Sequence, residues 1–168
     1  MLLKLSAALL LLSAAPTLAD VQVHFVEGAP KDRFIFTASD AFCEMGPIAL
    51  TVDLRGSAGA LLFDVAESGA GVEVFQPLEV VMGEDALLSA TTVADGDQSL
   101  TIELSALKPG MPFAFTIDVD DTLGAREITV SGSEILGAQV TLTSGSETRT
   151  ALFGENAEAV INWSSCDS

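Results

Sequence analysis

The sequence predicts an all-β protein, an antiparallel β-sandwich of jelly-roll type with about ten or more short strands. Apolar and polar residues alternate with a period of two in most segments, which is typical of half-buried strands. Turn-forming residues recur about every eight to twelve positions. No fixed-period repeat is visible, which argues against a solenoid or a propeller. A closed β-barrel is the alternative architecture.

Residues 1–19 predict a signal peptide rather than part of the fold. Lys4 gives the segment a basic start, residues 5–15 are apolar, and small residues lead up to a cleavage site after Ala19. The apolar run is too short to cross a bilayer as an ordinary helix. Residues 20–168 are therefore expected to form a single exported domain, secreted or periplasmic, that is not inserted in a membrane after signal removal.

Successive segments of this domain carry the alternating pattern between Gly, Pro, Ser and Asp turns. The expected strands lie at 21–25, 34–36, 48–54, 61–65, 72–75, 78–82, 87–93, 100–104, 148–153 and 159–163. Asp95-Gly96 predicts a hairpin between the two strands that flank it. Pro77 restricts the strand after it to an edge or a bulge, where Val80-Val81-Met82 could pair with another chain.

Residues 112–143 carry the clearest strand signal. The apolar positions of the first strand are Phe113, Phe115, Ile117 and Val119. Two further segments continue the alternation at Ile128, Val130, Val140 and Leu142. The stretch therefore predicts a meander of three strands, half-buried on one face, with an acidic corner at Asp118-Val119-Asp120-Asp121.

The formal net charge of −17 restricts the partners of this protein. Binding to nucleic acid or to an anionic membrane surface requires clusters of Lys and Arg, and these are absent. Cations are better candidates as ligands. The negative charge also has a plain explanation, because it keeps an exported protein in solution.

The two cysteines, Cys43 and Cys166, predict a disulfide. An even pair in an exported protein is most simply a bridge, and this one would tie the end of the chain to an early loop. In the chain-entropy model, closing so long a loop contributes roughly 4–5 kcal/mol. Two Cys and one His are too few soft ligands for a structural zinc site.

Two acidic turns are candidate calcium sites, since calcium prefers oxygen ligands. The candidates are Asp118, Asp120 and Asp121 in one turn and Asp95 and Asp97 in the other. The first turn is not an EF-hand loop, because Leu123 stands where glycine is needed and Thr129 where glutamate is needed. A nonstandard site between loops stays open. The alternative is that these aspartates only form turns by accepting backbone N–H bonds.

No catalytic motif is evident, so the protein is not expected to be an enzyme. His24 is the single histidine, it lies on the polar phase of its strand, and no G-x-S-x-G sequence accompanies it. Paired carboxylates of a glycoside hydrolase are a weak alternative, because chance pairs are frequent in so acidic a chain. Sugar-binding modules usually present several Trp or Tyr rings, whereas this chain has one Trp and no Tyr.

Three runs resemble a family of small exported proteins of marine alphaproteobacteria, the "aggregation factor core" proteins. They are Ala29-Pro-Lys-Asp-Arg-Phe34, Val72-Glu-Val-Phe-Gln-Pro77 and, most specifically, residues 115–132 with the sequence FTIDVDDTLGAREITVSG. The resemblance covers the whole mature chain. It implies an exported β-rich protein with a calcium-dependent role in adhesion or surface association, and no catalytic residue.

The leading hypothesis is an exported, non-enzymatic surface or interaction protein, related to adhesion and stabilised by calcium, whose partner is an unknown protein or glycan at the cell surface. An extracellular glycan-binding module is the second hypothesis. A hydrolase that uses paired carboxylates is the third. The partner and the oligomeric state are left open by the sequence.

Overall fold

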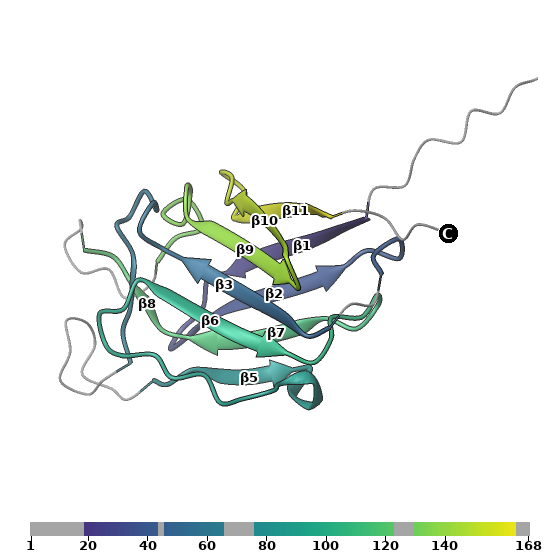
Figure 1. Cartoon of the computed structure of the whole chain (residues 1–168). Helices are drawn as coiled ribbons and strands as arrows, with labels where there is room; N and C mark the ends of the chain where they lie inside the picture. Colours follow the sequence, from purple (N-terminus) through teal and green to yellow (C-terminus); the bar gives the residue numbers. More distant parts are fainter. Residues whose placement is uncertain (1–18, 44–45, 66–75, 123–129, 164–168) are drawn as a thin grey trace, which may run out of the picture.

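The computed structural model describes residues 19–43, 46–65, 76–122 and 130–163 (Figure 1). The strands and the single short helix within these residues are β1 (Ala19–Val26), β2 (Asp32–Ala38), β3 (Ile48–Asp53), β4 (Leu62–Phe63), β5 (Glu79–Met82), η1 (Glu84–Ala86, a 3₁₀ turn), β6 (Ser99–Leu104), β7 (Phe113–Ile117), β8 (Val119–Asp120), β9 (Gln139–Ser144), β10 (Glu147–Leu152) and β11 (Glu158–Trp163).

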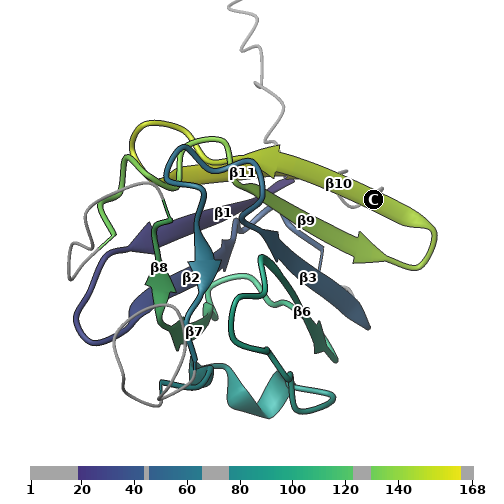
Figure 2. The ribbon, with the colours of Figure 1, turned by 90° about the vertical axis from the view of Figure 1, so that its left-hand side faces the viewer.

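Two antiparallel sheets pack face to face and confirm the predicted β-sandwich. One has the strand order β11-β1-β2-β7-β5 and the other β10-β9-β3-β6, and Figure 2 shows them as two layers. The sheets do not close into a barrel. The chain crosses between layers from β2 to β3, from β5 to β6, from β6 to β7 and from β10 to β11, whereas β1–β2 and β9–β10 are hairpins within one sheet.

Phenylalanine rings fill much of the space between the layers. The Phe34 ring lies 5.1 Å from both the Phe25 and the Phe115 ring, measured between centroids, and Phe36 lies 6.2 Å from Phe115. All four residues are buried, as their positions on the apolar phase predict. Burial of such rings is a main source of stability in a sandwich core.

The predicted meander in residues 112–143 is wrong. Its described strands lie in different sheets, since β7 belongs to the five-stranded layer, β8 pairs only with β4, and β9 belongs to the four-stranded layer. Alternation predicts a strand and its buried face, but it carries no information on which strand lies beside it. β7 is also buried on both faces rather than one, because Ala114 and Thr116 are covered as well.

The strand after Pro77 has the predicted edge position. Among the described strands, β5 is the last of its sheet and pairs with β7 alone, with an irregular register between Val80 and Met82. The prediction of a strand at 87–93 is wrong for most of that range. Only an isolated bridge from Leu87 to Leu104 forms there, although the turn at Asp95-Gly96 is present.

Several predictions fall outside the described residues. These are the signal peptide up to residue 18, the strand at 72–75, and Ile128, Leu123, Thr129 and Cys166. The disulfide therefore stays a prediction, although Phe42, next to Cys43, packs on Trp163 with ring centroids 6.4 Å apart. Within the described ranges, no helix has the length and apolar character needed to span a membrane.

Candidate cation site at one end of the sandwich

The short β4–β8 pair draws three separate parts of the chain together at one end of the sandwich, which faces the viewer in Figure 2. Leu62 pairs with Asp120 and Phe63 with Val119. The turn at Asp95-Gly96 joins them, because the Gly96 N–H donates to the Phe63 carbonyl at 2.9 Å. We call this region the acidic end and define it by its carboxylates, which belong to Asp32, Asp64, Asp95, Asp118 and Asp120.

Asp64 is the unusual residue of the acidic end. Only 1 % of it is exposed, and its backbone N–H donates to the Asp118 carbonyl at 3.1 Å. Both carboxylate oxygens are buried, and among the described residues neither accepts a hydrogen bond from a backbone N–H or a basic side chain; the polar group beside them is the Asp95 carboxyl. A buried carboxylate without partners is costly, so such a group must be neutral, paired with a cation or bound to a metal.

The surroundings of Asp64 oppose its ionisation. Burial, the neighbouring Asp95 carboxyl and the charges of Asp120 and Asp118 together raise its pKa to about 7. Three other carboxylates therefore act on one buried carboxyl group. A divalent cation would reverse this repulsion, because it attracts all four groups at once.

Asp118 follows β7 and is largely buried. Burial and the charge of Asp120 raise its pKa to about 6, while the Val119 N–H and the charge of Lys31 act to lower it. Lys31 cannot neutralise the whole acidic end, since its Nζ already lies 2.7 Å from Glu79 Oε2. The positive charge of Lys31 is thus shared between Glu79 and the acidic end.

Asp32 has the same burial as Asp64 but a structural role. Its two carboxylate oxygens accept the N–H groups of Gly28 at 3.0 Å and of Val119 at 3.2 Å. Burial raises its pKa to about 7, although these two hydrogen bonds act to lower it. Asp32 therefore fixes the start of β2 to the start of β8.

The five predicted calcium ligands separate into two groups. Asp118, Asp120 and Asp95 lie near Asp64, and all three raise its pKa. Asp95 also accepts the Val65 N–H at 3.1 Å. Asp97 instead has the turn-forming role, because its carboxylate accepts the Ala94 N–H at 2.8 Å. Asp121 is half-buried beside Asp120 and has a partner of its own.

The arrangement offers only oxygen ligands. His24, the single histidine, is elsewhere, with its Nδ1 3.3 Å from Glu158 Oε1 and a side chain that is 39 % exposed. Among the described residues, no three His, Cys, Asp or Glu side chains already converge on one point as a metal requires. An ion bound here would therefore need small rotations of the aspartates, with carbonyl oxygens and water completing the shell, which calcium tolerates better than magnesium does.

Sequence patterns did not single out Asp64 or Asp32. A usable signal was present for Asp64, because it interrupts the apolar run Leu61-Leu62-Phe63 before Val65. A carboxylate inside such a run is either at an edge or in a special environment. For Asp32 there was no signal, since its position next to Lys31 and Arg33 is typical of a surface turn.

The chain matches no protein-family model, and no curated protein or solved structure is significantly similar to it. The resemblance to aggregation factor core proteins stays a hypothesis. The function must therefore be argued from the acidic end itself.

Proposed function

We propose that this chain is an exported, non-enzymatic interaction protein with a role in surface association or adhesion, and that calcium bound at the acidic end stabilises its sandwich. The observation that carries the calcium proposal is Asp64, whose two buried carboxylate oxygens face other carboxyl groups and accept no hydrogen bond from a backbone N–H or a basic side chain of the described residues. The acidic net charge of −17 and the resemblance at residues 115–132 support it from the sequence.

The ligands would come from both sides of the β4–β8 pair. Asp64 provides the buried carboxylate, Asp118 and Asp120 provide two from the facing strand, and Asp95 provides one from the turn. Calcium takes six to eight oxygens at about 2.3–2.6 Å and accepts irregular geometry, so carboxylates, carbonyls and water can share one ion. Such an ion would connect segments that are far apart in the chain.

A thermal melt in EDTA and in millimolar calcium tests the metal. Saturating calcium is expected to raise Tm by about 5–10 °C, because a ligand that binds only the folded state stabilises it. Magnesium at the same concentration should act weakly. Equal Tm values in EDTA and calcium would remove the ion from the proposal.

Two variants locate the effect at the acidic end. Asp64→Asn is expected to abolish the calcium-dependent shift, because it removes the central charge. Asp97→Asn is the matched control, since it changes the same residue type in the adjacent turn, where the side chain only accepts the Ala94 N–H. A calcium response retained in Asp64→Asn would place the ion elsewhere.

Beads coated with each protein and scored for calcium-dependent clumping test the surface role.

A glycan-binding role is the second candidate, and the outer face of the four-stranded sheet favours it. One row of this face consists of Thr150, Thr141, Thr51 and Thr101, each paired with the next across the strands. Their hydroxyls bond in pairs at 3.1 Å and 2.8 Å. Retention on immobilised polysaccharides, lost in a Thr51→Val and Thr141→Val double variant, would favour this candidate.

A further inference from the structure

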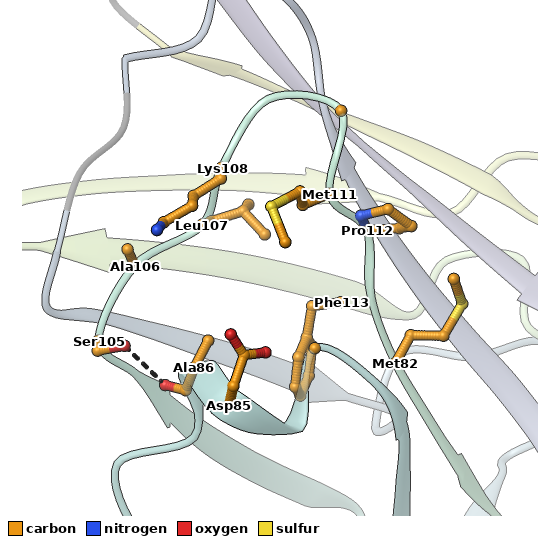
Figure 3. A pocket seen from close by; sticks show the side chains of 12 residues that line it. Met82, Asp85, Ala86, Ser105, Ala106, Leu107, Lys108, Met111, Pro112 and Phe113 are labelled. Atoms are coloured by element: carbon orange, nitrogen blue, oxygen red, sulfur yellow. Dashed lines mark hydrogen bonds between the residues drawn. The ribbon is translucent and has the colours of Figure 1, made fainter.

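A second feature lies away from the acidic end, where the turn after β5 faces the loop between β6 and β7. These segments enclose an open cavity of about 500 Å³ (Figure 3). Cavities of about 300–1,000 Å³ are the usual size for small-molecule sites. The calcium proposal does not involve any residue of this pocket.

The two walls of the pocket are held together by the backbone. The Ser105 N–H and the Ser105 hydroxyl both donate to the Ala86 carbonyl, at 2.7 Å and 3.1 Å. On the loop side, the Met111 N–H donates to the Lys108 carbonyl at 3.2 Å. A pocket with its walls tied in this way is formed before a ligand arrives, which lowers the cost of binding.

The inner surface is mostly apolar. Leu107 and Phe113 contribute buried side chains, each only 2 % exposed. Met82 and Met111 line the pocket with side chains that are 43 % and 57 % exposed. Methionine side chains are flexible and polarisable, so they adapt to apolar ligands of different shape.

One carboxylate gives the pocket a charge preference. Asp85 on η1 lines the pocket, and Figure 3 shows its carboxylate on the side that faces the Met111 thioether. Asp85 is exposed, so its carboxylate is accessible to a ligand in the pocket. Lys108 also lines the pocket, and Figure 3 shows its ammonium group on the loop wall, apart from Asp85. The whole-chain charge of −17 adds a field that favours cations.

We propose that this pocket binds a small organic cation with an apolar body, such as an alkylammonium group. The alkyl part would contact Leu107, Phe113 and the two methionines, and the ammonium group would face Asp85. An anionic ligand of the same size would be repelled by Asp85 and by the negative field of the chain, and among the described residues that line the pocket only Lys108 would attract it. An uncharged one would make the apolar contacts alone.

Methyl NMR of protein labelled with [¹³C-methyl]methionine tests the proposal, because the chain has only 4 methionines. The probes are hexylammonium, hexanol and hexanoate, which share one alkyl chain and differ in charge, at about 0.1 M salt to screen distant charges. Hexylammonium is expected to shift the Met82 and Met111 signals, assigned with Met→Leu variants, and to saturate at about 1–10 mM. Hexanol should bind more weakly and hexanoate weakest.

Two matched variants test the role of the carboxylate. Asp85→Asn is expected to weaken hexylammonium binding about three- to fivefold, the range for an exposed ion pair, and to leave hexanol binding unchanged. Glu84→Gln removes the same charge from the same turn but does not line the pocket, so it should have little effect. The proposal is overturned if all three probes bind alike, if neither methionine responds below about 10 mM, or if both variants weaken binding equally.

Discussion

Asp32 and Asp64 are two equally buried aspartates at the same end of the sandwich, and they differ in the groups that surround their carboxylates. Each has 1 % of its surface exposed. Asp32 accepts two backbone N–H groups, whereas both oxygens of Asp64 accept none. The two hydrogen bonds offset the cost of burying the Asp32 carboxylate. The Asp64 carboxylate has no such donors, so it needs a proton or a cation.

Replacing each aspartate by asparagine in EDTA separates these roles. Asp64→Asn is expected to raise the free energy of unfolding by about 1–3 kcal/mol, because it removes an unpaired buried charge. Asp32→Asn is expected to lower it by a similar amount, because the amide cannot accept both the Gly28 and the Val119 N–H. Urea unfolding at pH 8 measures both. A lower free energy of unfolding for Asp64→Asn in EDTA would contradict this role of Asp64.

At the scale of elements, two loops near the acidic end lie in close contact. The loop after β3 runs beside the loop before β9, and the Ala58 N–H donates to the Leu136 carbonyl at 2.8 Å. The loop after β3 also contacts Thr122, whose hydroxyl donates to the Ala60 carbonyl at 2.9 Å. These contacts support the β4–β8 pair, which has too few residues to be stable alone.

Gly56 marks the closest approach of the two loops. A Cβ atom there would lie 2.7 Å from the Gly137 carbonyl oxygen, so the backbone would have to move. Gly56→Ala is expected to lower the free energy of unfolding by about 1–3 kcal/mol and to weaken the calcium response. Gly132→Ala is the control, because its nearest contact is the Ala157 Cβ at 3.3 Å. Equal melting temperatures for the two variants would contradict the close approach.

At the scale of the whole molecule, the acidic carboxyl groups determine the pH dependence of stability. The pKa values of Asp32 and Asp64 are raised to about 7 and that of Asp118 to about 6, from an ordinary value of 3.8. Between pH 4 and 7 the folded state therefore holds more protons than the unfolded state does. Stability must then fall as pH rises through this window.

In EDTA, Tm is accordingly expected to be higher at pH 5 than at pH 8, by several degrees. The calcium-induced rise in Tm should be larger at pH 8, because the ion replaces protons that the folded state has lost. Below pH 4, stability should instead fall as the pH falls. Arg55 lowers the pKa of Asp53, so the stability that this pair contributes is lost when Asp53 becomes protonated. Thermal melts from pH 4 to 8 measure the trend. A Tm that falls steadily from pH 8 to pH 5 would contradict the prediction.

The sequence predicts those features of the fold that depend on residues close together along the chain. The period of two at Phe113, Phe115 and Ile117 predicted a buried strand face, and all three are buried. Pro77 predicted an edge strand, and β5 is one. Both are local properties, because alternation and the missing proline N–H act within a few residues.

Pairing between distant strands was decided only by the tertiary structure. The stretch around Asp118 looked like a meander, yet β7, β8 and β9 separate into different sheets. Asp64 met Asp95, Asp118 and Asp120 because β4 pairs with β8 and the turn at residue 95 packs against β4.

By itself, then, the sequence determined the β-sandwich class, the buried faces and the acidic character of the chain. The tertiary structure decided which acids share one environment and which of them is buried without a partner. The physical reason is that side-chain alternation depends on neighbours along the chain. A carboxylate's partners and pKa depend instead on neighbours in space, including Asp64 and Asp118, 54 residues apart but joined by one backbone hydrogen bond.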